Sequence, residues 1–167
     1  DEFYEGKTAE LITAYCASHG GLITRDDLAR YRTHDRTPVH TTFRGYDVYG
    51  MAPTASGGIV LTEMLNMLEP FDLKQDGPRS ARTLHRVTEA MRRAYFIRAT
   101  RLADPGFVAI PVEELAGKSF AAELGRSIAE RATPSQALAS FPVLAGEGSD
   151  TTHLSTLDAA GNAVALT

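Results

Sequence analysis

The chain has 167 residues, 43% of them hydrophobic, with 17 basic and 21 acidic side chains and a net charge of −4. These values fit one globular domain and exclude a disordered chain. The absence of an apolar run of about 18 residues predicts no membrane span in this stretch, and the negative charge argues against general nucleic-acid binding. The single cysteine, Cys16, excludes an internal disulfide and a multi-thiolate zinc site, and we expect it to be buried on a helix.

The first predicted element is a helix that Gly20 and Gly21 end, because glycine accepts the left-handed conformation that a helix end requires. Its apolar side chains recur near the helical period at Phe3, Leu11, Ile12 and Tyr15. A capping box then predicts a short second helix, since the hydroxyl of Thr24 can accept from the backbone N–H of Asp27.

A β-hairpin follows, with strands at 39–43 and 46–49 that are rich in β-branched and aromatic residues. Arg44 and Gly45 form its turn, and the Pro- and Gly-containing segment 53–58 is a loop. The next helix has a long apolar face, which predicts a buried position. The residues of this face are Ile59, Leu61, Met64, Leu65 and Leu68.

The longest helix signal covers residues 80–103, with Ser80 as its N-cap. Its predicted apolar stripe consists of Leu84, Val87, Met91, Tyr95 and Leu102. Two further helices are predicted at 112–116 and 120–131. Residues 133–149 have the composition of a linker. Strands at 151–158 and 163–167, joined by a turn at 159–162, complete the chain.

Charge is unevenly distributed along the chain. The segment from Arg79 to Arg101 holds seven arginines and one glutamate, a net charge of +6. Residues 1–78 and residues 102–167 each have a net charge of −5. Such a helix admits two interpretations: it binds an anion, or its arginines pair with carboxylates of the same fold. We favour the second, because no Gly-rich or aromatic partner motif accompanies the arginines.

Several catalytic motifs are absent from the sequence, among them GxGxxG, GxxxxGK[ST], GxSxG and HExxH. The five histidines are scattered, so we expect no metal site and no cofactor. Ser155, His153 and Asp158 do not make a triad, because neighbours along one strand point to opposite faces and cannot converge.

The informative segment is the junction of linker and strand at residues 148–153, where the strand opens with Thr151. A threonine hydroxyl is a weak nucleophile that needs an adjacent base. Cleavage of the peptide bond before Thr151 would free an α-amino group with a pKa of about 7.7–8.0, which suits a general base near working pH. The same residues are also ordinary strand residues, so composition alone leaves both interpretations open.

Four collinear motifs resemble those of the gamma-glutamyltransferase (gamma-glutamyl transpeptidase) family. Residues 151–167, TTHLSTLDAAGNAVALT, resemble the start of the family's small subunit. The upstream resemblances are GGLITRDDL at 20–28, RGY at 44–46 with MAPTASGG at 51–58, and EAM at 89–91 with Arg98 and ADPGF at 103–107. This sequence departs from the family pattern in a looser proline-rich stretch at 51–55, in Thr156 and Leu157 in place of paired valines, and in Ala103 in place of glycine. None of these departures falls on Thr151.

The resemblance implies an N-terminal-nucleophile hydrolase, an α/β (α+β) fold of which this chain holds part of an αββα sandwich. It also implies a precursor that cleaves itself between Asp150 and Thr151. Residues 1–150 would then be the C-terminal part of the large subunit, and residues 151–167 the start of the small subunit. Thr151 would be the nucleophile of both processing and catalysis. The supporting residues would be Thr152, His153, Asn162 and Thr167.

The implied substrate is glutathione or another gamma-glutamyl compound, whose acyl group passes to water or to an amino acid or peptide acceptor. The family implies a periplasmic or extracellular location, which this sequence itself leaves open. The first and last residues of the sequence both indicate a segment of a longer precursor. The family's carboxylate-binding arginine would precede Asp1. Its second active-site threonine, its acidic amino-group ligand and its oxyanion glycines would follow Thr167, so we expect this stretch alone to be inactive.

Two alternatives remain open. The first is a related acylase of the cephalosporin or glutaryl type, with the same Thr151 chemistry and a different acyl pocket. The second is a non-catalytic anion-binding module built on the helix from Arg79 to Arg101.

Overall fold

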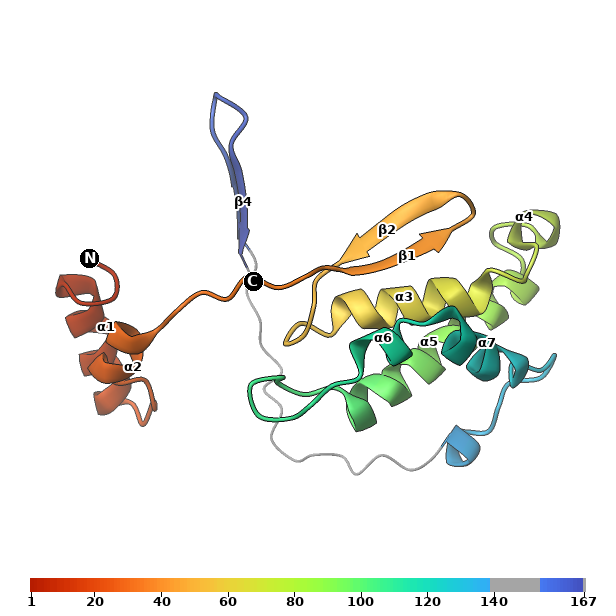
Figure 1. Cartoon of the computed structure of the whole chain (residues 1–167), viewed down its shortest axis with the longest axis horizontal. Helices are drawn as coiled ribbons and strands as arrows, with labels where there is room; N and C mark the ends of the chain where they lie inside the picture. The colour runs from red at the N-terminus through yellow and green to blue at the C-terminus, as the bar shows by residue number, and fades with distance from the viewer. Residues whose placement is uncertain (139–153, 167) are drawn as a thin grey trace.

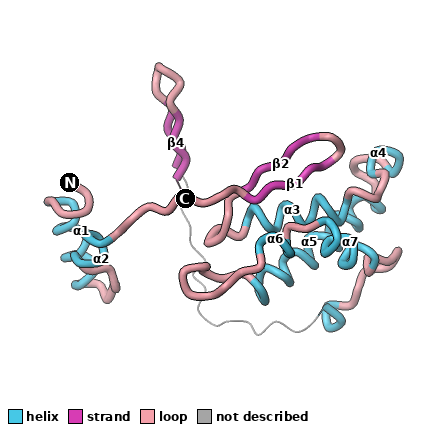
Figure 2. Tube along the Cα trace, viewed as in Figure 1, coloured by secondary structure: helices cyan, strands magenta, loops and turns pink. Residues whose placement is uncertain are grey.

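The computed structural model of the protein describes residues 1–138 and 154–166. It combines helices with antiparallel hairpins, as the sequence predicts (Figures 1 and 2). The helices are α1 (Lys7–Ser18), α2 (Arg25–Arg30), α3 (Gly57–Leu68), α4 (Leu73–Asp76), α5 (Ala81–Arg101), α6 (Val112–Leu115), α7 (Lys118–Arg126) and the 3-10 turn η1 (Ser135–Leu138). The strands are β1 (Val39–Phe43), β2 (Tyr46–Gly50), β3 (Leu154–Leu157) and β4 (Ala163–Leu166).

Helices α1 and α2 contact each other, and their predicted ends are confirmed. Gly20 has a φ of 74° just after α1. At α2 the capping box is complete: the N–H of Asp27 donates to Thr24 Oγ1 at 3.2 Å, and the N–H of Thr24 donates to Asp27 Oδ2 at 2.8 Å. Cys16 lies on α1 as expected, but it is half-buried rather than buried.

The β1–β2 hairpin is confirmed at its predicted position, with Phe43 opposite Tyr46 and Val39 opposite Gly50. Arg44 and Gly45 have φ values of 50° and 86°. Two positive φ values in succession are those of a type I′ turn, whose twist matches that of the paired strands. Successive side chains of a strand point to opposite faces. On β1, Val39 and Thr41 are the buried ones, and both face α3.

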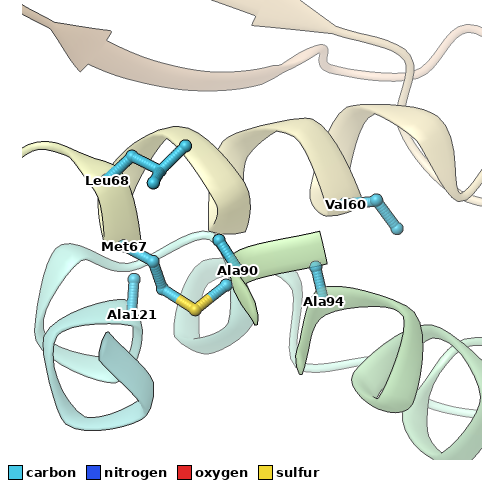
Figure 3. Close-up of a cluster of buried hydrophobic side chains, with 6 residues drawn as sticks. All are labelled: Val60, Met67, Leu68, Ala90, Ala94 and Ala121. Atoms are coloured by element: carbon cyan, nitrogen blue, oxygen red, sulfur yellow. The ribbon is translucent and has the colours of Figure 1, made fainter. Parts of the chain in front are cut away.

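Helix α3 lies between the β1–β2 hairpin on one side and helices α5 and α7 on the other (Figure 1). Where the three helices meet, three of the six buried side chains are alanine. This cluster comprises Val60, Met67, Leu68, Ala90, Ala94 and Ala121. Figure 3 shows Met67 extending from α3 toward Ala90 of α5, with Ala121 of α7 beside it. Alanine at these positions lets the helices approach closely, and a dense core results.

A polar bridge and a second cluster join α3 to the hairpin and to α6. The Oγ1 of Thr41 donates to Asn66 Oδ1 at 2.8 Å, and Nδ2 of Asn66 donates to the carbonyl of Ala116 at 3.1 Å. The buried apolar side chains of the second cluster are Val39, Ile59, Ile97 and Leu115. One asparagine thus connects β1, α3 and the end of α6, and its buried amide is satisfied on both atoms.

The predicted buried face of α3 is partly wrong. Ile59 and Leu68 are buried, but Leu61 is 43% exposed, and polar residues take buried positions in its place. The polar residues buried on α3 are Thr62, Glu63 and Asn66. The reason is that neighbours enclose α3 on more than one side, so burial extends beyond a single apolar stripe.

The predicted apolar stripe of α5 is partly wrong as well, although Val87 and Leu102 do pack against the buried clusters. Leu84, Met91 and Tyr95 are 58%, 41% and 52% exposed, whereas the buried residues are mostly small or charged. They are Thr83, Glu89, Ala90, Arg93, Ala94 and Ile97. Ala90 and Ala94 of α5 pack against α3, whereas Leu84, Met91 and Tyr95 lie on the exposed side of the helix.

Several boundaries also differ from those expected. Helix α7 ends at Arg126 rather than at residue 131, and neither α4 nor η1 was predicted. Most of the predicted linker, residues 139–149, lies outside the described residues. Among the described residues, no helix is both long enough and apolar enough to cross a membrane.

Two glycine backbones touch where β2 leads into α3. A Cβ built on Gly58 would lie 2.1 Å from the carbonyl oxygen of Met51 and 2.8 Å from the carbonyl carbon of Gly50. A real Cβ cannot occupy such positions, and neither neighbour is a side chain that could rotate away. Glycine at position 58 is therefore what allows α3 to start directly under the hairpin.

We predict that Gly58→Ala in the full-length protein destabilises it by about 1–3 kcal/mol, because the added methyl group pushes α3 away from β2. Thermal unfolding of the two proteins measures the effect. Gly57→Ala is the matched control, since a Cβ at Gly57 meets no atom of the described residues within 4 Å. Equal midpoints for the two variants would contradict the close contact.

One carboxyl group of α3 is buried without a partner. Glu63 is 0% exposed, and neither carboxylate oxygen has a hydrogen-bond partner among the described residues. Burial raises the pKa of Glu63 from 4.5 to about 8, with Arg101 only partly opposing the shift. The group is therefore neutral in the folded protein at pH 7. Below about pH 4.5 the carboxyl group is protonated in both the folded and the unfolded protein, so its ionisation costs no stability. Stability is lost as the pH rises from there to about 8.

We predict that Glu63→Gln removes this loss. Gln cannot ionise, so the variant should gain stability relative to the wild type between about pH 4.5 and 8, by an amount on the order of 4 kcal/mol at the upper end. Unfolding midpoints of both proteins from pH 5 to 9 measure the gap. Glu123→Gln, at an exposed carboxyl of α7, is the control. A gap that does not change with pH would contradict the prediction.

Candidate functional site

The predicted site residues fall mostly outside the described part of the chain. Asp150, Thr151, Thr152, His153 and Thr167 are not among residues 1–138 and 154–166. The structure places the sixth, Asn162, in the turn between β3 and β4. Strand β3 begins at Leu154, three residues after Thr151. The predicted strand–turn–strand is thus confirmed where it is described.

The β3–β4 hairpin is short and regular. Leu154 pairs with Leu166 and Leu157 with Ala163, in antiparallel register. The side chains of β3 are exposed, including Leu157 at 74%. The described residues therefore give this hairpin no packed core.

Three hydrogen bonds of the turn between β3 and β4 converge on the carboxylate of Asp158. Its Oδ1 accepts from the backbone N–H groups of Ala160 and Asn162, each at 2.9 Å. Its Oδ2 accepts from Nδ2 of Asn162 at 2.8 Å. The Asn162 side chain is the first cause, and the Asn162 backbone the second, of a lowered pKa for Asp158. The turn closes at Gly161, whose φ is 85°.

Sequence reasoning missed this role, because it weighed Asp158 only as a member of a triad. A signal was available. Asp followed by Gly-Asn three residues later is typical of a turn in which the carboxylate bonds backbone N–H groups ahead of it and glycine takes the positive φ. The prediction for Asn162 as a supporting residue gains a definite partner here, namely Asp158.

The arginines of α5 are engaged within the fold. In the part of the chain that the structure describes, all six arginines of α5 bond or pair with a neighbour. The pairs are Arg82–Asp76, Arg86–Asp76, Arg92–Glu89, Arg93–Glu89, Arg98–Ser56 and Arg101–Glu114. Ser56 precedes α3, and its hydroxyl accepts from Arg98 Nε at 3.1 Å. Five of these arginines share three carboxylates of the same fold, Asp76, Glu89 and Glu114, and this pairing supports the structural interpretation of the arginine-rich helix.

The centre of this network is the buried pair of Glu89 and Arg93, which are 1% and 3% exposed. Burial alone would raise the pKa of Glu89, but hydrogen bonds from Thr133, Arg93 and Arg92 outweigh it and lower that pKa to about 2. Arg93 also donates through Nε and Nη2 to the hydroxyl and carbonyl of Ser127, at 2.7 and 2.8 Å. The pair therefore fastens residues 127–133 to α5, just before the predicted linker.

Two further features of the described residues bear on other kinds of site. Among them, no group of three or more His, Cys, Asp or Glu side chains is placed to hold a metal ion. A groove of about 710 Å³ lies between β1 and α6, lined by Val39, Pro53 and Val112 among others. Asn162, the one predicted site residue that is described, does not line it.

Comparisons with known proteins show which family the chain resembles along its length. The sequence model of the family described as gamma-glutamyltranspeptidase matches residues 1–167. A glutathione hydrolase proenzyme of Escherichia coli K12 is 42% identical over 168 residues, covering 100% of this chain and 29% of that protein. An acylase ACY 1 proenzyme of Pseudomonas sp. SE83 is 40% identical over 167 residues, with the same two coverages.

The fold agrees with the sequence match. The crystal structure of Helicobacter pylori gamma-glutamyltranspeptidase superimposes with a TM-score of 0.77 at 38% identity, covering 89% of this chain and 43% of that one. The helical layer of α3, α5 and α7 with a hairpin packed on it is thus part of an N-terminal-nucleophile hydrolase fold. The chain spans about 29% of the length of the curated relatives it matches. With a family model matched along its whole length and a shared fold, this chain belongs to the gamma-glutamyltranspeptidase family.

Proposed function

We propose that this chain is part of the precursor of a gamma-glutamyltransferase or glutathione hydrolase, and that Thr151 is its nucleophile. The observation that carries the proposal is the family match over residues 1–167, which includes the segment starting at Thr151. The names of two relatives, glutathione hydrolase proenzyme and acylase ACY 1 proenzyme, support maturation from a precursor. Residues 1–150 then belong to the large subunit, and residues 151–167 open the small subunit.

The first step of the proposed chemistry is self-cleavage. The hydroxyl oxygen of Thr151 attacks the carbonyl carbon of Asp150, the C–N bond breaks, and its nitrogen takes the hydroxyl proton. An ester between Asp150 and Thr151 results. Water hydrolyses this ester, which leaves a carboxylate on Asp150 and a free α-amino group on Thr151.

The second step is acyl transfer. The new α-amino group, with a pKa of about 7.7–8.0, takes the proton of the Thr151 hydroxyl as its oxygen attacks the γ-carbonyl carbon of a gamma-glutamyl amide. The amide C–N bond breaks, and the leaving amine takes the proton. The glutamyl ester on Thr151 then passes its acyl group to water, or to the amino group of an amino acid or peptide. No metal or cofactor enters either step.

A second candidate is an acylase of the cephalosporin or glutaryl type. It rests on the SE83 acylase proenzyme, which is 40% identical to this chain, close to the 42% of the E. coli glutathione hydrolase. Both candidates use the same proposed nucleophile. The glutaryl type differs from a gamma-glutamyltransferase in accepting an acyl group that lacks the α-amino group.

Intact-mass measurement of the full-length protein tests the nucleophile. We predict two chains, the smaller beginning at Thr151, and a single uncut chain for Thr151→Ala, because alanine has no hydroxyl to attack Asp150. Ser149→Ala, which removes a hydroxyl on the other side of the same bond, should cleave like the wild type. A cut Thr151→Ala protein, or a new N-terminus elsewhere, would refute the mechanism.

A pair of matched substrates separates the two candidates. A gamma-glutamyl anilide and a glutaryl anilide differ only in the α-amino group. We predict that kcat/KM favours the gamma-glutamyl compound by about 100-fold or more, since a pocket built to pair that group rejects an analogue lacking it. A preference for the glutaryl anilide would assign the protein to the acylases instead.

A further inference from the structure

Helix α5 binds the post-α7 segment, residues 127–135, at several points along its length. Nε2 of His85 donates to the carbonyl of Ala129 at 2.7 Å. Nη2 of Arg92 donates to the hydroxyl of Ser135 at 3.3 Å. The segment is therefore attached along α5 rather than at a single residue.

The central attachment is the guanidinium of Arg93, which has five N–H donors in a fixed planar fork. Nη1 donates to Oε2 and to the backbone carbonyl of Glu89, at 2.7 and 3.1 Å. Nε donates to the hydroxyl of Ser127 at 2.7 Å, and Nη2 donates to the carbonyl of Ser127 at 2.8 Å and to the hydroxyl of Thr133 at 3.1 Å. All five donors have acceptors, and three of these acceptors belong to the post-α7 segment.

Glu89 attaches the same segment from the acceptor side. Its Oε2 accepts from the hydroxyl of Thr133 at 2.6 Å and from the backbone N–H of Thr133 at 3.4 Å. Release of the segment would therefore break five hydrogen bonds to the charged pair of Glu89 and Arg93 at once. Hydrogen bonds to charged groups are about twice as strong as neutral ones, so the separation of the segment from α5 is costly.

This contact does not depend on parts of the precursor outside the described residues. Glu89 and Arg93 are buried by the described residues alone. Chain that packs onto this body from elsewhere adds to that burial and does not remove it. Both partners of each of the five bonds also belong to the described part of the chain. The attachment is therefore a property of α5 and the post-α7 segment themselves.

We propose that Glu89 and Arg93 form an anchor that keeps the post-α7 segment on α5 both before and after the precursor is cut. The part of this inference that concerns cutting rests on the proposed self-cleavage between Asp150 and Thr151, and the anchor itself does not. The anchor touches no substrate and takes no part in the chemistry. It fixes the place on the helical body from which the large subunit continues toward the cleavage site.

The first test compares the cut wild-type protein with full-length Thr151→Ala, the variant expected to stay uncut. Hydrogen exchange of backbone amides is followed by mass spectrometry on peptides that cover residues 127–135. We expect the exchange rates of the two proteins to agree within about twofold, because the same bonds protect the segment in both. Faster exchange in the cut protein, beyond that margin, would overturn the proposal, because cleavage would then release the segment.

The second test removes the anchor from the side of the segment. Thr133→Val deletes the hydroxyl that bonds both Glu89 and Arg93 and keeps the shape of the side chain. We expect peptides from residues 127–135 to exchange at least about tenfold faster than in the wild type, since hydrogen bonds to charged groups are lost, while peptides from α5 keep wild-type rates. Thr100→Val is the matched control and should match the wild type, because the hydroxyl of Thr100 bonds only carbonyls of its own helix among the described residues.

Two results of the second test would overturn the proposal. They are wild-type exchange in Thr133→Val, and an equal increase along α5, which would mean that the whole helical body is loosened. If Thr133→Val fails to fold, Ser127→Ala must give the local increase instead, because it removes an acceptor of Arg93 and leaves the bonds of Glu89 in place. Failure of the proposed function would look different: the wild-type protein would stay uncut, and Thr133→Val would still exchange faster.

Discussion

The contact on which the helical body depends is that of helix α3 with its neighbours on either side. Its first turn touches the backbone of β2 at Gly58, and its other side meets the alanines of α5 and α7. Small residues at both contacts bring the hairpin, α3 and α5 into one tightly packed unit. The bridge from Thr41 through Asn66 to Ala116 then connects the hairpin to α6.

Two buried carboxyl groups in this unit have opposite environments. Glu89 is surrounded by donors, so it stays charged and ties α5 to residues 127–133. Glu63 lacks a partner among the described residues, so burial holds it neutral instead. Glu89 holds residues 127–133 against α5, just before the predicted linker. Glu63 lowers the stability of the folded protein increasingly as the pH rises. Both lie on the buried faces of helices whose sequences read as ordinary amphipathic segments.

Local signals in the sequence predicted the local structure well. The Thr24 capping box, the Arg44-Gly45 turn and the Ser80 cap all mark real boundaries, because each depends on a few adjacent residues. Burial was predicted poorly on α5, where alanines and an ion pair face inward and Tyr95 faces out. That choice depends on how closely α3 approaches, which periodicity does not encode. Thr151 came from resemblance to a family, and Asp158 was overlooked because its role is to hold a turn.

The central claim is that Thr151 carries the acyl group during catalysis. It is tested most directly by incubating the mature full-length protein with a glutamine analogue that bears an electrophile in place of the side-chain amide, followed by peptide mapping. The predicted result is one covalent adduct, on the peptide that begins at Thr151, with activity lost in proportion to labelling. Labelling of a different residue in step with the loss of activity would contradict the claim.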